Sequence, residues 1–593
     1  MGSIRFGSMS PRKLTPLFQG TILFTAIVFI LSLATLNLHA DTPGTATNIT
    51  SEKNLKQPYN ILFIVCDQEQ YSLLSSPGYE LPARQRLIQK GIKFTNHYIS
   101  SAMCSPSRAS FLTGLPPQRT GVFDQMEYPY QPTLSPTIPT MGSVLKKLGY
   151  TTAYFGKFEM NKDVLAIKND VNYSAALVPY GFDTFSASGD ILSNPNYGYK
   201  NDCFTAGEAV RWLRESGRKS SDNGKPFFMV ASLLNPHDIM FGNANPPGKT
   251  IQKGLASPSL TTPPRNTIYQ QQWSFSLPPS LTESLTSPGM PSALLEYKKG
   301  WCGGLGNIPT DSPAMWKFYY NYYLNMIRDN DATLQTIVDA LDQEDLWKNT
   351  IVIFTADHGE MGGSHGGIRG KGPFAYEQNS KVPFIIDHPD FPSGTSDVLT
   401  SHLDILPTMI GLTKLPESRQ KEAMKGLPGH DFSQTLSSEK RNNVHAIRDG
   451  VLFNYVGPGT IDAKFCEDSL GAVFVPGLKI TLESLKPSLN KRGFLAFTTD
   501  GRYKFARYYA PDAFNSPTTI DEIFKYNDVQ LFDLKKDPNE MNNLALDREK
   551  NKETILRMNG LLNDLMAKEV GKNDGSFLPE VIRPKGEVVF QKQ

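Results

Sequence analysis

The stretch YNILFIVCDQEQ, residues 59–70, is a run of apolar residues that ends in acidic and amide side chains. Three further stretches share this design: TTAYFGKFEM at 151–160, PFFMVASLLNPHD at 226–238 and NTIVIFTADHGE at 349–360. Their apolar parts, roughly five to eight residues long, are too continuous for strands that keep one face in water. Runs of this kind are typical of central strands in a parallel sheet that is covered on both faces. The four stretches therefore predict a single buried sheet.

Segments with the pattern of helices lie between these strands. In residues 312–343, Ser312 and Pro313 are typical of a helix start, and apolar side chains then recur at helical spacing. These side chains are Phe318, Tyr322, Ile327, Leu334, Ile337, Val338 and Leu341. The alternation of strands and helices predicts an α/β fold, with a large, mainly parallel sheet flanked by helices.

Polar side chains follow each of the four predicted strands. They are Asp67 and Gln68, Lys157 and Glu159, His237 and Asp238, and Asp357 and His358. In sheets of this class, ligands bind beyond the carboxyl ends of the strands, so these groups are expected to gather at one edge. A single Asp or His there is commonly a helix cap or half of a salt bridge. Four such sets at one edge indicate a functional site.

The composition is that of a globular protein, with 39% apolar and 20% charged residues in a chain of 593. The formal net charge is +2, and no extended block of one sign is present. Neither a nucleic acid nor a membrane surface is therefore expected as a partner. An anionic ligand would have to be recognised by a few local cations.

Residues 1–40 are typical of a signal peptide, because Arg5, Arg12 and Lys13 precede an apolar run that ends near Ala40. The run is also long enough to span a bilayer, so an N-terminal anchor stays open as the alternative, and only then would a membrane be involved. Residues 41–57 are predicted to be a polar linker. We therefore expect an exported protein, periplasmic or secreted.

Two regions are predicted after the linker, a large α/β domain at 58–445 and a smaller α+β subdomain at 446–593. The second shows alternating stretches, FLAFTTDGRYKFARYY and VQLFDL, with a turn at Asp500 and Gly501. An amphipathic helix is expected to pack on this antiparallel sheet, with Ile555, Leu556, Leu562, Leu565 and Met566 as its apolar residues. In the first region, residues 241–313 read as a long loop, either part of a substrate pocket or a surface insertion.

Five cysteines are spread along the chain, at Cys66, Cys104, Cys203, Cys302 and Cys466. An odd number leaves at least one unpaired in an exported chain, and the wide spacing shows neither a disulfide framework nor a metal knuckle. The unpaired cysteine therefore needs a chemical reason.

Cys104 opens the stretch CSPSRASFLTG, residues 104–114. Ser105 is expected to be an N-cap, Pro106 the first helical residue and Gly114 the end of a short helix. Cys104 would then lie at the positive end of the helix dipole, beside Arg108. This setting is expected to favour an anion.

The stretch CSPSRASFLTG resembles the signature of the type I sulfatases, which are formylglycine-dependent members of the alkaline phosphatase superfamily. Further blocks of that family are similar to NILFIVCDQEQ, GYTTAYFGKFEM, NPHD, TADHGEMGGSHGGIRGKGPFAYEQNSKVPFII, HLDILPTMIGL and LFDLKKDPNEMNNLA. The resemblance covers about residues 58–570. It implies a sulfuric ester hydrolase that cleaves a sulfate ester of a small molecule or carbohydrate to an alcohol and inorganic sulfate.

The resemblance also implies two cofactors. The signature cysteine of the family is oxidised to Cα-formylglycine, so Cys104 would be a precursor, and a formylglycine-generating enzyme would be a partner during maturation. One divalent cation would be held by Asp67, Gln68, Asp357 and His358. Two carboxylates and an amide oxygen suit Ca²⁺, the usual metal of the family, whereas the imidazole would also suit Mn²⁺.

Catalytic roles carry over by the same resemblance to Cys104, Arg108, Lys157, Glu159, His237 and Lys371. The hydrated aldehyde at residue 104 would attack sulfur, while Arg108, Lys157 and Lys371 would neutralise the sulfuryl oxygens. His237 would contact the ester or protonate the leaving oxygen. His365 would line the pocket or support it from behind.

One position departs from the family pattern, because Glu159 stands where most members have a histidine two residues after the lysine. Either Glu159 is the base that acts on the hydrated aldehyde, or it points away and selects a cationic or hydroxyl-bearing leaving group. Two other functions stay open beside the sulfatase reading. The metal set also resembles that of formylglycine-dependent phosphonate monoester and phosphodiester hydrolases, and the loss of the histidine is compatible with a catalytically weak binder of sulfated ligands.

Overall fold

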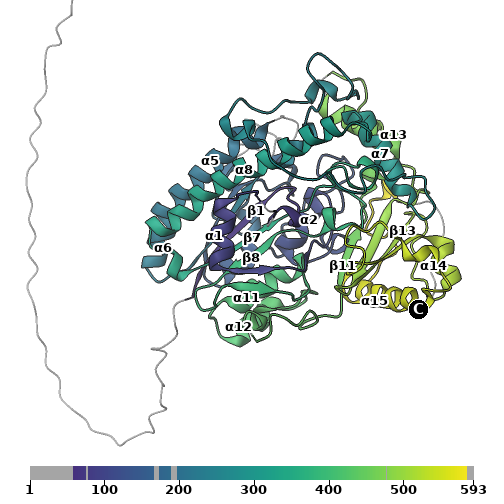
Figure 1. The fold of residues 1–593 in the computed structure, drawn as a ribbon. Helices are drawn as coiled ribbons and strands as arrows, with labels where there is room; N and C mark the ends of the chain where they lie inside the picture. The colour runs from purple at the N-terminus through teal and green to yellow at the C-terminus, as the bar shows by residue number, and fades with distance from the viewer. Residues whose placement is uncertain are drawn as a thin grey trace, which may run out of the picture. The chain divides into compact units, whose positions relative to one another are not determined.

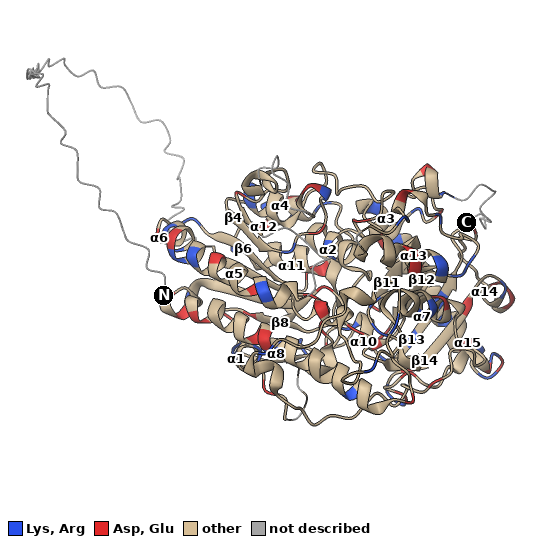
Figure 2. Cartoon of the chain, turned by 90° about the horizontal axis from the view of Figure 1, so that it is seen from above, with Lys and Arg blue, Asp and Glu red and all other residues tan. Residues whose placement is uncertain are grey.

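The computed structural model describes residues 58–583, apart from 75, 77, 166–172, 188–195, 438 and 476. These residues belong to one compact unit, Leu55–Gln593. The predicted signal peptide and linker, residues 1–57, lie outside the described residues. In the part of the chain that is described, no helix is both long and apolar enough to cross a membrane. Acidic and basic residues are interspersed over the elements (Figure 2), as the small net charge predicts.

An eight-stranded sheet forms the centre of this unit, in the order β5-β4-β6-β1-β7-β8-β2-β9 (Figure 1). Its strands are β1 Asn60–Cys66, β2 Ile92–Phe94, β4 Thr151–Gly156, β5 Thr184–Ser186, β6 Phe227–Leu233, β7 Thr350–Ala356, β8 Phe384–Asp387 and β9 Gly394–Ser396. β1 pairs in parallel with β6 and β7, and β6 pairs in parallel with β4. β8 runs against both of its neighbours, β7 and β2. The predicted α/β fold with a mainly parallel sheet is confirmed.

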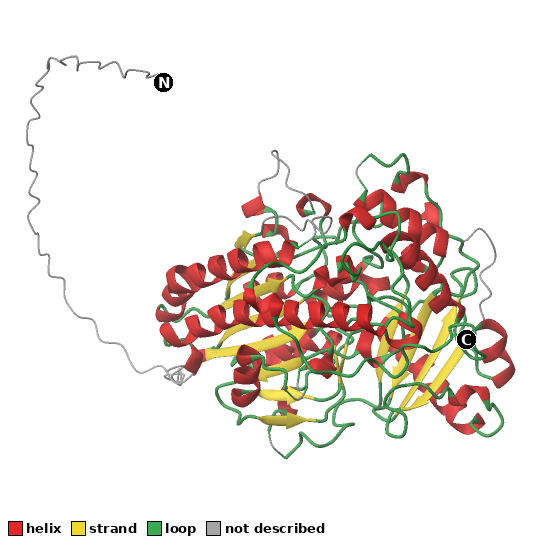
Figure 3. Cartoon of the chain, turned by 45° about the horizontal axis from the view of Figure 1, so that its top comes forward, coloured by secondary structure: helices red, strands yellow, loops and turns green. Residues whose placement is uncertain are grey.

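Helices cover both faces of the sheet (Figures 1 and 3). They are α1 Pro82–Lys90, α2 Cys104–Thr113, α3 Pro117–Thr120, α4 Met141–Lys147, α5 Tyr197–Trp212, α6 Arg218–Asp222, α7 Ser292–Leu305, α8 Pro313–Gln343, α9 Ser364–Gly367, α10 Glu377–Ser380, α11 Ile405–Leu412 and α12 Glu417–Met424. The apolar run of β1 is continuous because its successive side chains are buried on opposite faces of the sheet. Phe63 packs in the core that contains Phe111 of α2, whereas Ile64 packs in the core that contains Leu334 and Ile337 of α8.

α8 begins as the sequence predicts, with Ser312 before it and Pro313 in its first turn. Six of the seven apolar positions expected on its inner face are buried. The exception is Phe318, which is 41% exposed. The first turns of α8 bury Met315, Trp316, Tyr319 and Tyr322, and Phe318 lies on the side of the helix away from them.

A second sheet follows late in the chain (Figure 3). Its antiparallel strands, in the order β11-β12-β13-β14, are Val451–Tyr455, Phe494–Thr499, Tyr503–Tyr509 and Asp528–Asp533. The turn between β12 and β13 contains Gly501 with φ 87°, a conformation that favours glycine. Helix α15, Lys552–Leu565, covers this sheet, and α14 Ile520–Tyr526 precedes β14. The predicted antiparallel sheet and its helix are present, with β11 as a strand that the sequence pattern did not single out.

The long loop expected at residues 241–313 contains helix α7, Ser292–Leu305, so its last part is not structureless. α7 packs on α13, Ala463–Phe474, from the C-terminal region. The two helices approach closely because α7 has glycines at the crossing. A Cβ on Gly300 would lie 2.6 Å from the Cβ of Cys466, and one on Gly304 would lie 2.4 Å from a methyl of Leu470. The sequence did not predict α7 because three glycines in a Pro- and Ser-rich region are typical of a loop.

Candidate active site

The four predicted strand ends meet at one edge of the central sheet. Asp67 follows β1, Lys157 follows β4, His237 begins a 3₁₀ turn soon after β6, and Asp357 and His358 follow β7. Because β4, β6, β1 and β7 are adjacent and parallel, their carboxyl ends lie side by side. The expected gathering of these groups is therefore observed.

Cys104 lies in the middle of this gathering, as the first residue of α2. Its Sγ is 3.2 Å from Nε2 of His358 and 3.9 Å from Oδ1 of Asp67. Ligand atoms of Asp67, Cys104, Asp357 and His358 all lie within 4.8 Å of one another, and all four residues are buried. Three groups able to bind a cation thus surround the signature cysteine.

The start of α2 differs from the prediction by two residues. The helix begins at Cys104 and its N-cap is Met103, with φ 61°, so neither Ser105 nor Pro106 has the expected role. Pro106 still falls in the first turn, where backbone N–H groups have no helical partner. The predicted end is correct, since Gly114 has φ 69° and its N–H donates to the carbonyl of Ser110.

This setting does not activate the Cys104 thiol itself, and the expected preference for a bound anion beside it stays a prediction. Burial raises the pKa of the Cys104 thiol well above its usual value, and the carboxylates of Asp67 and Glu159 add to the effect. Arg108 was expected to lie beside the cysteine, but its guanidinium contacts the carboxylates of Asp67 and Asp357 instead. A buried thiol beside two acids is a poor thiolate nucleophile.

Arg108 uses its guanidinium to hold the two acids of the cluster. Its Nη2 lies 3.0 Å from Oδ2 of Asp67 and 2.9 Å from Oδ2 of Asp357, and its Nε donates to the same Asp357 oxygen over 3.0 Å. Nη1 donates to the carbonyl of Lys157 at 2.9 Å and to the hydroxyl of Ser232 at 2.8 Å. Arg108 therefore fixes both carboxylates in place, which is a positioning role that the resemblance did not imply.

The donor set fits a hard divalent cation. While the Oδ2 atoms face Arg108, Oδ1 of Asp67 and Oδ1 of Asp357 lie 3.7 and 3.6 Å from Nε2 of His358. Burial and the neighbouring Asp67 raise the pKa of Asp357 to about 7, a repulsion that a bound cation would relieve. Nδ1 of His358 is 3.0 Å from the carbonyl of Gly359, which leaves Nε2 to face the acids.

Gln68 and Lys371 are in direct contact at the rim of this cluster. Nζ of Lys371 donates to Oε1 of Gln68 at 2.6 Å, and the amide nitrogen of Gln68 donates to the buried carboxylate of Glu360. Glu360 in turn accepts N–H groups from Gly362 and Gly370. Glu360 therefore holds the amide nitrogen of Gln68, so that the amide oxygen faces Lys371.

Glu159 is buried beside the site, and both roles considered for it stay open. Its carboxylate is 2.8 Å from Nζ of Lys157 and accepts a hydrogen bond from Nε2 of Gln125 at 3.3 Å. Lys157 also pairs with Asp67 at 2.7 Å, and Gln125 also accepts from the N–H of Ser105. Glu159 thus belongs to a chain of polar contacts that begins at Asp67 and ends at Ser105 of α2.

His237 is buried and its Nδ1 lies 3.2 Å from a carboxylate oxygen of Asp238. Burial lowers the pKa of His237 well below its usual value, with Lys371 and Lys157 contributing, so its imidazole is neutral. His365, for which two roles were open, stacks on Tyr376 with ring centroids 3.5 Å apart and contacts Glu283. These contacts are those of a supporting residue.

A cavity of about 70 Å³ opens beside the catalytic groups, lined by Gln125, His237 and Lys371. The rest of its wall is largely apolar and aromatic. It is formed by Met103, Tyr128, Met240, Trp301, Thr460, Cys466, Ser469, Leu470, Val473 and Phe474, together with Glu127. Trp301 comes from α7, so the segment predicted to form part of a pocket wall does contribute to one, and α13 forms the opposite side.

Three contributors were not singled out from the sequence: Gln125, Ser232 and Glu360. Ser232 lies inside an apolar strand and Gln125 in a connecting loop, where single polar residues carry no signal. Glu360 stands in the stretch TADHGE, three residues after Asp357, and its place after a buried strand could have marked it.

A buried cluster of acids, histidine and cysteine at the carboxyl edge of a mainly parallel sheet defines a hydrolase of the alkaline phosphatase superfamily. The profile of the sulfatase family, described as Sulfatase, matches residues 59–415. The match covers more than half of the chain, and the chain belongs to this family.

Relatives and solved structures agree with this assignment. The chain is 23% identical over 521 residues to the Delta 4,5-hexuronate-2-O-sulfatase of Bacteroides thetaiotaomicron, covering 86% of this chain and 89% of that protein. It is 26% identical to the ulvan-active sulfatase of Formosa agariphila, covering 67% and 68%. A solved 2-O GAG sulfatase matches with a TM-score of 0.59 at 20% identity, covering 86% of this chain and 93% of that one. The solved phosphonate monoester hydrolase of Agrobacterium radiobacter matches with a TM-score of 0.58 at 21% identity, covering 86% of this chain and 96% of that one.

Proposed function

We propose that this sulfatase-family hydrolase cleaves sulfate esters to an alcohol and inorganic sulfate, through an aldehyde made from Cys104 and one divalent metal. The observation that carries the proposal is the position of Cys104. It lies at the start of α2, with the ligand atoms of Asp67, Asp357 and His358 within 4.8 Å. A nucleophile at this point would be next to the cation that activates it.

An unmodified Cys104 would be poorly suited to act as the nucleophile. A thiol whose pKa is raised by burial and by neighbouring carboxylates is a weak nucleophile at neutral pH. The hydrated aldehyde would supply a hydroxyl as nucleophile and, after sulfate transfer, a second hydroxyl to release the product. A formylglycine-generating enzyme would be the partner in maturation, and export of the chain belongs to the same proposal.

Asp67, Gln68, Asp357 and His358 would hold the metal, and Ca²⁺ is the proposed ion. Two carboxylates and one amide oxygen match the oxygen ligands that calcium prefers, and the cation would lower the pKa of the attacking hydroxyl. His358 keeps Mn²⁺ as the alternative. Arg108 would hold the two acids at the spacing that the cation requires.

The remaining residues would act on the ester itself. Lys157 and Lys371 are buried cations that can neutralise charge on the sulfuryl oxygens. Neutral His237, oriented by Asp238, can contact the ester oxygen. Glu159 is the proposed base, because its carboxylate lies 3.9 Å from Nε of Arg108, farther than those of Asp67 and Asp357, and is linked to Gln125 and Lys157.

The cavity lined by Trp301 and Phe474 would receive part of the leaving alcohol, since it opens beside His237 and Lys371 but, at about 70 Å³, is too small for a whole sugar unit. Its aromatic walls suit the flat face of a sugar ring or an aryl group. The relatives named above act on hexuronate and ulvan, so a sulfated carbohydrate is the proposed natural substrate class.

Phosphonate monoester hydrolysis is the competing activity, because the metal set of two acids, a glutamine and a histidine would serve it as well. The test compares kcat/KM for an aryl sulfate and an aryl phosphonate monoester on one preparation whose conversion at residue 104 has been measured. The proposal requires the sulfate to be preferred and the Cys104→Ala variant to be inactive on it. A preference for the phosphonate would reject it, and so would saturable binding of an aryl sulfate by fully converted protein without turnover.

A further inference from the structure

A buried guanidinium without an acidic partner lies in the C-terminal sheet. Arg507 of β13 is 3% exposed. Its cross-strand neighbours are Ala496 of β12 and Val529 of β14, which carry no charge. The hydrogen bond that the structure gives it runs from Nη1 to Oδ1 of Asn559 on α15, at 2.8 Å. Within the described part of the chain, no carboxylate forms an ion pair with Arg507.

Burial of such a group needs an explanation, because charges taken out of water are normally paired. Among the other buried arginines that the structure describes, Arg84, Arg108 and Arg448 follow that rule, whereas Arg369 and Arg441 donate to backbone carbonyls instead. Arg84 pairs with Glu69 and Asp331, and Arg108 pairs with Asp67 and Asp357. Burial lowers the pKa of Arg507 to about 10, so the group still carries its charge at neutral pH. Arg507 therefore has unmet capacity for an anion.

Arg507 lines a cavity of about 610 Å³ between β13, the end of α15 and the loop after it. This volume lies within the range of pockets that bind small molecules, about 300–1,000 Å³. Polar groups beside Arg507 in the lining are Tyr509, Asn515, Ser516 and Asn573. Lys572 also lines the cavity but pairs with Asp574 at 2.6 Å, so Arg507 supplies the unbalanced charge.

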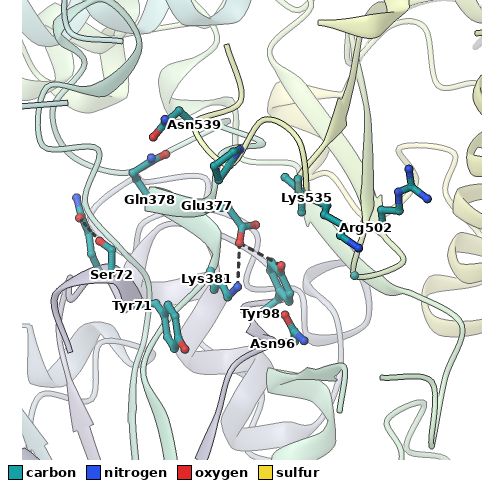
Figure 4. A pocket seen from close by; sticks show the side chains of 14 residues that line it. Tyr71, Ser72, Asn96, Tyr98, Glu377, Gln378, Lys381, Arg502, Lys535 and Asn539 are labelled. Atoms are coloured by element: carbon teal, nitrogen blue, oxygen red, sulfur yellow. Dashed lines mark hydrogen bonds and ion pairs between the residues drawn. The ribbon is translucent and has the colours of Figure 1, made fainter. Parts of the chain in front are cut away.

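A second polar cleft, of about 670 Å³, shows the contrast (Figure 4). There Glu377 points at Lys381 and at the hydroxyl of Tyr98, with both contacts at 3.2 Å. Arg502, on the same cleft, pairs with Asp533 at 3.1 Å. Lys381 and Arg502 are compensated within the protein, and Lys535 of the same cleft is exposed to water, whereas Arg507 is buried without a carboxylate.

We propose that the cavity at Arg507 binds an acidic sugar unit, with its carboxylate or sulfate held in the fork of the guanidinium. The planar guanidinium matches an oxyanion with two parallel hydrogen bonds. Amide and hydroxyl groups of Asn515, Ser516 and Asn573 suit the hydroxyls of the ring. The cavity shares no lining residue with the active-site cavity, so this is a separate site that would hold another unit of an acidic saccharide.

Isothermal titration of the full exported protein tests the site, with D-glucuronate, D-glucose and inorganic sulfate as probes. Glucuronate is expected to bind, glucose to show no saturable heat, and sulfate to bind more weakly than glucuronate. The Arg507→Met variant should lose at least about tenfold in glucuronate affinity, the size expected for hydrogen bonds to a charged group. The matched control is Arg557→Gln on α15, which removes an exposed charge outside the cavity and should bind as the wild type does.

Stability distinguishes a binding residue from a structural one. Without ligand, Arg507→Met should unfold at or above the wild-type temperature, because it removes an uncompensated buried charge. Arg507→Lys should stay folded and bind glucuronate more weakly, since it keeps the charge and loses the fork. A large fall in unfolding temperature for Arg507→Met, equal glucuronate affinity in wild type and both variants, or equal binding of sulfate and glucuronate would overturn the proposal. None of these readouts depends on turnover at Cys104.

Discussion

Replacing Arg108 by lysine is expected to destabilise the protein and to leave the metal ligands badly placed. The guanidinium contacts Asp67 and Asp357 at 2.9–3.0 Å, and all three side chains are fully buried. A lysine keeps the charge, but it cannot reach both carboxylates, the carbonyl of Lys157 and the hydroxyl of Ser232 at once. One buried acid then loses its partner, which costs about 3–5 kcal/mol.

The expected shift in unfolding temperature follows from the size of the compact unit, about 540 residues. At about 2.1 cal/mol/K per residue, the entropy of unfolding is about 1.1 kcal/mol/K, so the loss corresponds to about 3–5 °C. Thermal unfolding would be followed in EDTA and again with excess calcium. Calcium should recover part of the loss, because the cation supplies positive charge to the same two acids.

Arg119→Lys is the matched control, since Arg119 is exposed on the neighbouring helix α3. It should unfold with the wild type in both buffers, and its kcat should be unchanged. Arg108→Lys should lose at least about a hundredfold in kcat/KM, as expected when catalytic groups shift out of position. Wild-type unfolding in EDTA for Arg108→Lys would refute the view that this side chain holds the acids together.

Three further outcomes are expected. Glu159→Gln should lower kcat, because an amide cannot accept the proton, whereas Glu159→His should retain turnover with a shifted pH optimum; an unchanged rate and pH profile in Glu159→Gln would exclude Glu159 as the base. EDTA should abolish turnover, and calcium should restore it better than manganese; full activity after exhaustive chelation would argue against a catalytic metal. Trp301→Phe removes an indole N–H that is buried without a partner at the cavity wall. For esters of oxygen-rich alcohols, KM should therefore rise about three- to tenfold with little change in kcat. Equal KM values for the wild type and the variant would place the alcohol elsewhere.

The sheet and the position of its polar residues could be predicted from the sequence because the signals are local. The continuous apolar runs of β1, β6 and β7 reflect burial on both faces, and a site residue follows each strand directly or within four residues. Parallel pairing then brings Asp67, His237 and Asp357 to one edge without further information. The end of α2 was equally readable, since Gly114 adopts a conformation that favours glycine.

The partners within the site were not predictable in this way, because they depend on distances between segments far apart in the chain. Arg108 was expected to face Cys104 or the ester, yet the nearest acceptors across α2 are two carboxylates from β1 and β7. Helix α7 was missed for a different reason: the glycines that let it pack on α13 are also the residues that make its sequence look like a loop.

The central claim is that Cys104 is the precursor of the nucleophile. Its most direct test is the mass of the tryptic peptide from Phe94 to Arg108, taken from protein exported by a host that has the maturation enzyme. The account predicts a peptide lightened by exchange of the CH₂SH group of residue 104 for CHO, in proportion to aryl sulfatase activity across preparations. An unmodified Cys104 that is fully alkylated after denaturation, in protein that nevertheless hydrolyses the ester, would contradict it.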